Sequence, residues 1–126
     1  MSRKDIAVLF NEWNSALASR DADRVIELYE EQGLLLPTLS DKVRSNRMEM
    51  KDYFVDFLTG APQAKINESN IKMSGDLAVN SGVYTFTFST RPSVKARFTF
   101  VYQWNGRRWM IAQHHSSQMP WPPKTY

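Results

Sequence analysis

Residues 94–117, VKARFTFVYQWNGRRWMIAQHHSS, decide the fold class. Residues 94–104 alternate between two sets of side chains, which is typical of a half-buried strand. Asn105 and Gly106 both tolerate positive φ and favour a tight hairpin turn. We therefore predict a second strand over residues 107–117, paired with the first in antiparallel fashion.

Further strands are predicted before this hairpin. Residues 64–74 and 77–89 keep the period of two, and Ser74-Gly75-Asp76 forms a turn between them. Residues 34–36 add a short extended segment. The four long strands, joined by short connections, predict an antiparallel meander.

The first half of the chain has helical periodicity instead. Apolar residues three and four apart predict a helix over residues 3–18. Asp21 is a suitable N-cap for a second helix that Gly33 would end, and Asn46 opens a third helix that stops at Gly60. Three N-terminal helices followed by a meander predict an α+β fold, in which a curved antiparallel β-sheet wraps around the helices and leaves a cone with an open mouth.

Composition narrows the class of protein. A chain of 126 residues predicts a single domain over residues 1–126. The absence of cysteine excludes disulfides, thiolate metal sites and cysteine nucleophiles. No apolar run approaches the roughly 20 residues of a membrane span, so we expect a cytoplasmic protein without membrane partners. No phosphate-binding loop is present, and neither a cofactor nor a metal is expected.

The charge is distributed unevenly along the chain. The formal net charge is +3, and residues 77–126 contain six Lys and Arg but no Asp or Glu. These cations are too scattered for a nucleic-acid surface, so no nucleic-acid partner is expected. A pocket lined by the second half of the chain would favour anions.

Two residues of the hairpin could contribute chemistry. Adjacent strand residues face opposite sides, so only one of His114 and His115 can point into the cone. We place His115 there, either as a general acid/base or as a donor to an anionic ligand; packing at a subunit interface is the alternative. Arg97 lies on the more polar face of its strand, where it either meets solvent or clamps a carboxylate.

Aromatic residues supply the remaining candidates. The helical half offers four that either fill the core or line a cavity: Trp13, Tyr29, Tyr53 and Phe57. The tyrosine hydroxyls need partners if buried, which makes them the more suitable polar lining. One face of the strand over residues 94–104 is more apolar than a monomer needs and predicts contact with a second copy through the sheet; its residues are Phe98, Phe100, Tyr102 and Trp104.

Three segments carry a family resemblance: FNEWNSALASRDADRVIELYEEQGLLLPTLS, MKDYFVDFL and KARFTFVYQWNGRRWMIAQHHSSQMP. Over about residues 3–120 the chain resembles the nuclear-transport-factor-2-like (NTF2-like) superfamily. More narrowly it resembles the association (hub) domain of calcium/calmodulin-dependent protein kinase II and SnoaL-like stand-alone bacterial proteins.

The resemblance implies a cone of curved sheet around a long helix. It also implies assembly through the sheet into dimers or rings of dimers. The hub pocket, lined by arginines and aromatics, accepts small carboxylates, and Arg97 and His115 are the best matching positions. Isomerases, cyclases and dehydratases of the superfamily use an Asp or His acid/base, for which His115 is the candidate.

Three functional hypotheses follow. We favour a homo-oligomer with a cone pocket for small carboxylates or other anions. The alternative is a cone-fold enzyme in which His115 acts as acid/base. The third is a scaffold whose cone is filled by side chains, which a structure without a cavity larger than a few waters would support.

Overall fold

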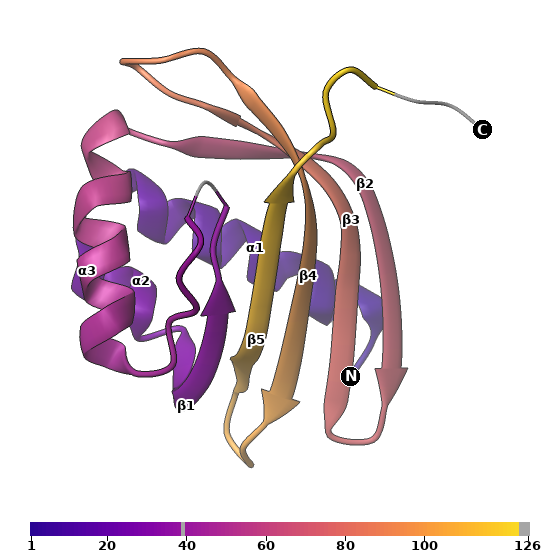
Figure 1. The fold of residues 1–126 in the computed structure, drawn as a ribbon. Coiled ribbons are helices and arrows are strands. Elements are labelled where there is room, and N and C mark those ends of the chain that lie inside the picture. Colours follow the sequence, from indigo (N-terminus) through magenta and orange to yellow (C-terminus); the bar gives the residue numbers. More distant parts are fainter. Residues whose placement is uncertain (39, 124–126) are drawn as a thin grey trace.

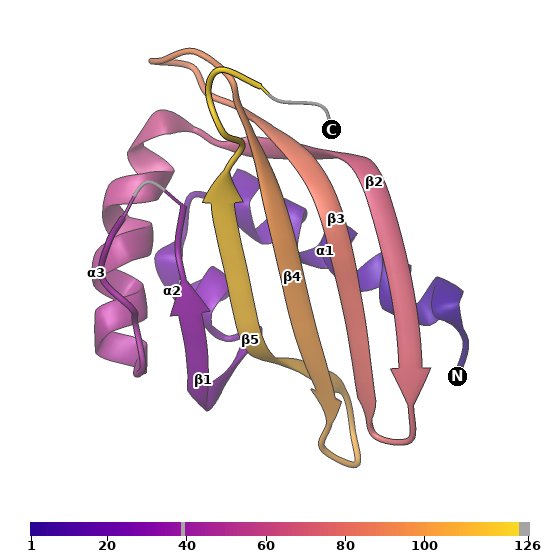
Figure 2. The same ribbon diagram turned by 45° about the vertical axis from the view of Figure 1, so that its right-hand side comes forward.

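The computed structural model describes residues 1–38 and 40–123, and it places the helices on one face of a five-stranded sheet (Figures 1 and 2). The helices are α1 (Arg3–Ala18), α2 (Ala22–Ile26) and α3 (Arg47–Phe57), the last followed by a 3-10 turn, Leu58–Gly60. The strands are β1 (Tyr29–Leu36), β2 (Gln63–Ser74), β3 (Leu77–Thr87), β4 (Val94–Trp104) and β5 (Trp109–Gln118). In the part of the chain described, no helix is long and apolar enough to cross a membrane.

The strands are ordered β1-β5-β4-β3-β2 across the sheet. The four long strands form the antiparallel meander expected from the sequence. β1 differs, because it pairs in parallel with β5 at the opposite edge from β2. α3 and the turn after it carry the chain from one edge of the sheet to the other, which makes this crossover possible.

Local side-chain contacts begin α1 and α3 at the predicted positions. The backbone N–H of Ser2 donates to the Asp5 carboxylate over 2.7 Å. At α3, the Asn46 side chain accepts from the backbone N–H of Glu49 over 2.9 Å. Both contacts give a side-chain acceptor to a backbone N–H group at the start of a helix, where no acceptor from a preceding turn is available.

The prediction that Gly33 ends the second helix is wrong. α2 ends at Ile26, and Gly33 lies inside β1. A Cβ at Gly33 would lie 3.0 Å from the carbonyl oxygen of Glu30 and 3.1 Å from that of Ile111. Glycine is therefore needed for the close approach of β1 to β5, where the register between the two strands shifts.

The core lies between α1 and the concave face of the sheet. α1 contacts β2 and β3, and Trp13 is 1% exposed at the centre of an aromatic cluster. Its ring stacks on Tyr84 at an interplanar angle of 9°, and it meets Phe100 edge-on with centroids 5.3 Å apart. The helix thus buries its apolar stripe against aromatic side chains of β3 and β4.

The aromatic face of β4 points inward, which corrects the expectation that it meets a second copy. Phe98, Phe100 and Tyr102 are each no more than 3% exposed and pack beneath the helices. The core takes the more apolar of the two faces, so the other face of β4, with Arg97, points outward.

A β-bulge in β5 decides which histidine points inward. Val101 pairs with Gln113 and Tyr102 pairs with Ile111, so Ala112 is an extra residue without a partner on β4. The bulge shifts the alternation by one position. Ile111 and His114 are therefore both buried, whereas His115 is exposed.

Candidate functional site

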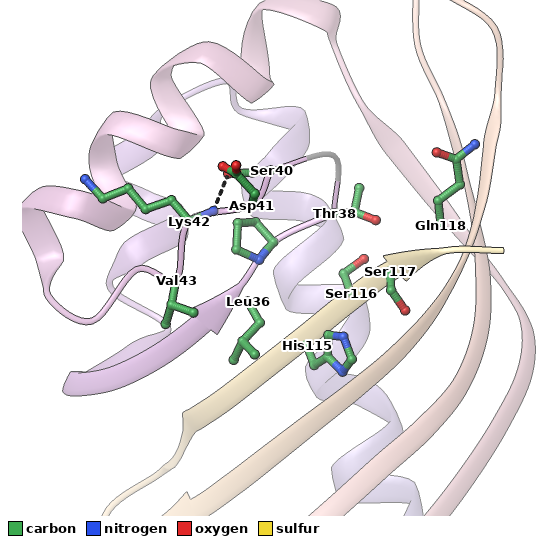
Figure 3. A pocket seen from close by; sticks show the side chains of 11 residues that line it. Leu36, Thr38, Ser40, Asp41, Lys42, Val43, His115, Ser116, Ser117 and Gln118 are labelled. Atoms are coloured by element: carbon green, nitrogen blue, oxygen red, sulfur yellow. Dashed lines mark hydrogen bonds between the residues drawn. The ribbon is translucent and has the colours of Figure 1, made fainter. Parts of the chain in front are cut away.

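The cone opens where β5 ends beside the segment that follows β1 (Figure 3). An open cleft of about 850 Å³ lies there, which we call the mouth cleft. Residues 36–38, 40–43 and 115–118 line it. A cleft of this volume is in the size range of small-molecule sites, roughly 300–1,000 Å³.

A second, much smaller space lies deeper in the cone. This inner cavity has a volume of about 10 Å³, and Thr38 and Ser116 line both it and the mouth cleft. Such a volume holds about one water molecule. Side chains therefore fill the interior of the cone, and the space available to a ligand lies at its mouth.

A chain of buried hydrogen bonds runs from α1 to the inner cavity. The indole Nε1–H of Trp13 donates to the Tyr29 hydroxyl over 3.2 Å, and that hydroxyl lies 2.8 Å from Nδ1 of His114. Nε2 of His114 is 3.2 Å from the Tyr84 hydroxyl, which is 2.6 Å from Oγ of Ser116. Four elements, α1, β1, β3 and β5, hold these five residues in one network.

The direction of the protons in this chain follows from its first member. Indole N–H can only donate, so the Tyr29 hydroxyl accepts from Trp13 and uses its own proton toward Nδ1 of His114. His114 then donates from Nε2–H to Tyr84, and Tyr84 donates to Ser116. If Nδ1–H of His114 instead donated to Tyr29, the Tyr29 hydroxyl proton would have no acceptor at a fully buried position.

Burial keeps this network uncharged. Desolvation is the main cause that lowers the pKa of His114 to about 3, and neighbouring His115 adds to it. Desolvation also raises the pKa of Tyr29 and Tyr84 well above the ordinary value, although their hydrogen bonds to Trp13 and Ser116 act in the opposite sense. His114 is therefore a neutral imidazole at physiological pH, and both its ring nitrogens are occupied.

Thr38 lies between the inner cavity and the mouth cleft, because it lines both. The Tyr53 hydroxyl donates to the backbone carbonyl of Thr38 over 3.1 Å, and burial raises the pKa of Tyr53. The side-chain hydroxyl of Thr38 is buried and has no hydrogen-bond partner among the described residues. This is an uncommon state for a buried polar group.

The residues proposed from the helical half of the sequence are largely brought together. Trp13, Tyr53 and Phe57 line the inner cavity. Tyr29 lies behind it and is hydrogen-bonded to Trp13 and His114, which both line the cavity. His115 lines the mouth cleft, but it is exposed and has no described hydrogen bond.

Arg97 is not part of either space. It is exposed on the outward face of β4, where its cross-strand neighbours are Val83 and Ser117. The expected clamp on a carboxylate inside the cone therefore lacks its cation. The physical reason is the choice of face: the helices cover the aromatic side of β4, and Arg97 occupies the other.

Sequence reasoning missed part of the site. Thr38 and Tyr84 were not proposed, and the choice between His114 and His115 was made on a regular alternation that the bulge at Ala112 breaks. The run of paired polar residues His114 to Ser117 was the available signal, since it places two of them on each face whatever the register.

Neither Ser116 nor His115 has, among the described residues, the hydrogen-bonded neighbours of an activated nucleophile or base. Ser116 accepts a hydrogen bond from Tyr84 and has no adjacent base, and His115 has no described group that would orient it. Among residues 1–38 and 40–123, no group of three or more His, Asp or Glu side chains is placed to hold a metal ion. The lining of the mouth cleft carries one carboxylate, Asp41, and one ammonium group, Lys42.

Comparison with known proteins agrees with the fold. A solved structure described as a candidate calcium/calmodulin dependent protein kinase II association domain from Xanthomonas campestris shares 41% identity, covering 96% of this chain and 90% of that chain, with a TM-score of 0.92. An NTF2-like protein of unknown function from Shewanella oneidensis shares 24% identity at a TM-score of 0.77, covering 93% and 99% of the two chains.

A candidate dehydratase of the NTF2-like family from Streptomyces avermitilis shares 14% identity at a TM-score of 0.79, covering 93% of this chain and 95% of that chain. At this identity the likeness concerns the fold alone. Among curated proteins, no match was found. The family model of the calcium/calmodulin dependent protein kinase II association domain matches residues 2–120. The chain therefore belongs to this association-domain family and has its NTF2-like cone fold.

Proposed function

We propose that the chain forms a homo-oligomer through the outward face of its sheet and binds a small molecule in the mouth cleft. The observation that carries the binding function is the cleft of about 850 Å³, which ends at the buried hydroxyls of Thr38 and Ser116. The name of the family, an association domain, supports the assembly.

The outward face supports assembly on physical grounds. It is the face of the sheet opposite the helices (Figure 2), and its central residues include Val79 and Val101, which are cross-strand neighbours, with Val83 and Met110 nearby. These side chains are only partly buried within one chain. A partly apolar face that no described element covers is suited to a second copy of itself, because a twofold axis makes such a face self-complementary.

The structure gives no support to the preference for small carboxylates that was expected from the sequence. A preference for small carboxylates depended on Arg97 lining the hollow, and Arg97 lies on the outward face. The charged groups of the mouth cleft, Asp41 and Lys42, oppose each other in sign. We therefore propose only that the ligand is small, and small carboxylates enter the test as one arm.

Catalysis by His115 has less support. That side chain is exposed at the edge of the cleft, and no described group is hydrogen-bonded to it to orient it. The filled interior is also what a pure scaffold would have. A pure scaffold does not need the open cleft at the mouth, so this cleft favours the binding function over the scaffold.

Light scattering coupled to size-exclusion chromatography tests the assembly at micromolar concentration. We expect the wild type to be a dimer or larger, and Val101→Glu to be a monomer because a charge would face its own copy across the interface. Val55→Glu is the matched control, since Val55 is 55% exposed on α3. A monomeric wild type, or a Val101→Glu variant that assembles like the control, would contradict the proposal.

A further inference from the structure

The unpartnered hydroxyl of Thr38 points to a ligand group. Thr38 is 3% exposed, yet its Oγ1 has no hydrogen-bond partner among the described residues. Burying a hydroxyl without a partner costs free energy, and the cost is removed when an acceptor arrives. Because Thr38 lines both the inner cavity and the mouth cleft, an acceptor can reach it from the cleft.

Ser116 provides a second proton at the same place. It accepts the hydrogen bond from Tyr84 at the end of the chain that begins at Trp13. The hydroxyl proton of Ser116 therefore has no acceptor within this series of hydrogen bonds. Ser116 is 6% exposed and lines the same two spaces as Thr38. Two neutral hydroxyl donors thus meet where the inner cavity joins the mouth cleft, and we call this place the junction.

The wall of the inner cavity is formed by uncharged side chains. The described residues that line the inner cavity include no Lys, Arg, Asp or Glu, and aromatic rings such as Trp13 and Phe57 form most of its wall. Lys42 belongs to the outer part of the cleft and extends away from Thr38 and Ser116 (Figure 3). An ionised group at the junction would lose its hydration without a counter-ion in the cavity wall, which is costly.

We propose that the junction binds the uncharged carbonyl oxygen of a small molecule, to which Thr38 and Ser116 both donate. The oxygen enters the space of about 10 Å³, which has the size of one water molecule. The body of the ligand lies outside it, along Leu36 and Pro37 in the mouth cleft. This inference rests on the proposed ligand-binding function and specifies the chemistry that the cleft recognises.

Benzamide and benzoate form a matched pair of probes, because they have nearly the same shape but only benzoate is charged at neutral pH. Titrations followed by ligand-observed NMR give the Kd of each probe for wild type, Thr38→Val and the control Thr90→Val. Thr38→Val keeps the shape of the side chain and breaks no hydrogen bond of the hydroxyl within the described chain. Ser116→Ala, in contrast, would leave Tyr84 without its acceptor and is not needed for the test.

We expect benzamide to bind at least about tenfold more tightly than benzoate, because the junction lacks a cation. Loss of one donor in Thr38→Val should weaken benzamide binding by about threefold to tenfold. Thr90→Val should bind benzamide like the wild type, since Thr90 is exposed and lines neither the mouth cleft nor the inner cavity.

The inference is overturned if benzoate binds as tightly as benzamide, or if Thr38→Val binds benzamide like the wild type. Tight benzoate binding would still leave the mouth cleft as a ligand site, so the proposed function would survive. If neither probe binds, the junction holds only water, and both this inference and the binding part of the proposed function fail. The light-scattering result would then decide whether assembly alone remains.

Discussion

The buried hydrogen-bond chain makes Tyr29→Phe the most informative perturbation of the fold. Tyr29 is fully buried, and its hydroxyl joins the indole N–H of Trp13 to Nδ1 of His114. Removing the hydroxyl leaves one buried donor and one buried acceptor without partners. At roughly 1–3 kcal/mol for each orphaned group, we expect a loss of about 3 kcal/mol in the free energy of unfolding.

Urea unfolding followed by tryptophan fluorescence measures this loss directly. All variants are compared at one protein concentration, because assembly makes apparent stability depend on concentration. For a domain of this size, a loss of about 3 kcal/mol corresponds to a fall in Tm of roughly 12 °C.

Tyr53→Phe is the matched control for this experiment. The Tyr53 hydroxyl makes a single hydrogen bond, to the carbonyl of Thr38, at a partly buried position. Its loss should cost about 1 kcal/mol. Equal losses in Tyr29→Phe and Tyr53→Phe would refute the view that Tyr29 is the internal link of a continuous chain.

Two further predictions concern the sheet and the buried histidine. In β3, a Cβ at Gly82 would lie 1.9 Å from the carbonyl oxygen of Glu68, so Gly82→Ala should lose more than about 3 kcal/mol in the free energy of unfolding or fail to fold. Gly75 has open space but a φ of 56°, so Gly75→Ala should lose only about 1 kcal/mol in the same urea assay. Similar losses in the two variants would contradict the close approach at Gly82. Burial lowers the pKa of His114 to about 3, from an ordinary value of 6.5, so only the unfolded chain takes up this proton as the pH falls from 6.5 towards 3, and acid removes stability over that window. Between about pH 7 and pH 5 the wild type should lose about 2 kcal/mol more than His114→Gln, which cannot titrate; equal losses in urea unfolding would mean that His114 does not titrate differently in the two states.

Much of the fold could be predicted because local signals agreed with the final packing. The apolar spacing over residues 3–18 and the cap at Asn46 describe contacts within a few residues of each other. Asn105 and Gly106 likewise specify their turn locally. The parallel pairing of β1 with β5 could not be predicted in this way, since it joins segments about eighty residues apart and depends on the path of α3.

The candidate site was harder to predict because it depends on which face of each strand is buried. For β4 this is a single choice between two faces, and when it is reversed every residue of the strand changes side. The prediction placed Arg97 in the hollow and Phe98 and Phe100 at the interface, whereas in the structure Arg97 is exposed and Phe98 and Phe100 are buried in the core.

The bulge at Ala112 explains the position of His115. It brings His115 onto the same outward face as Arg97, because Thr99, the neighbour of Arg97 on that face, pairs with His115. Arg97 and His115 thus both lie on the face that we propose to meet a second copy. If Val101→Glu separates the copies, the environment of His115 should change with it, whereas His114, whose contacts all lie inside one chain, should keep its hydrogen bonds to Tyr29 and Tyr84. Imidazole NMR resonances of His114 that shift as much as those of His115 would show that the inner network also depends on assembly.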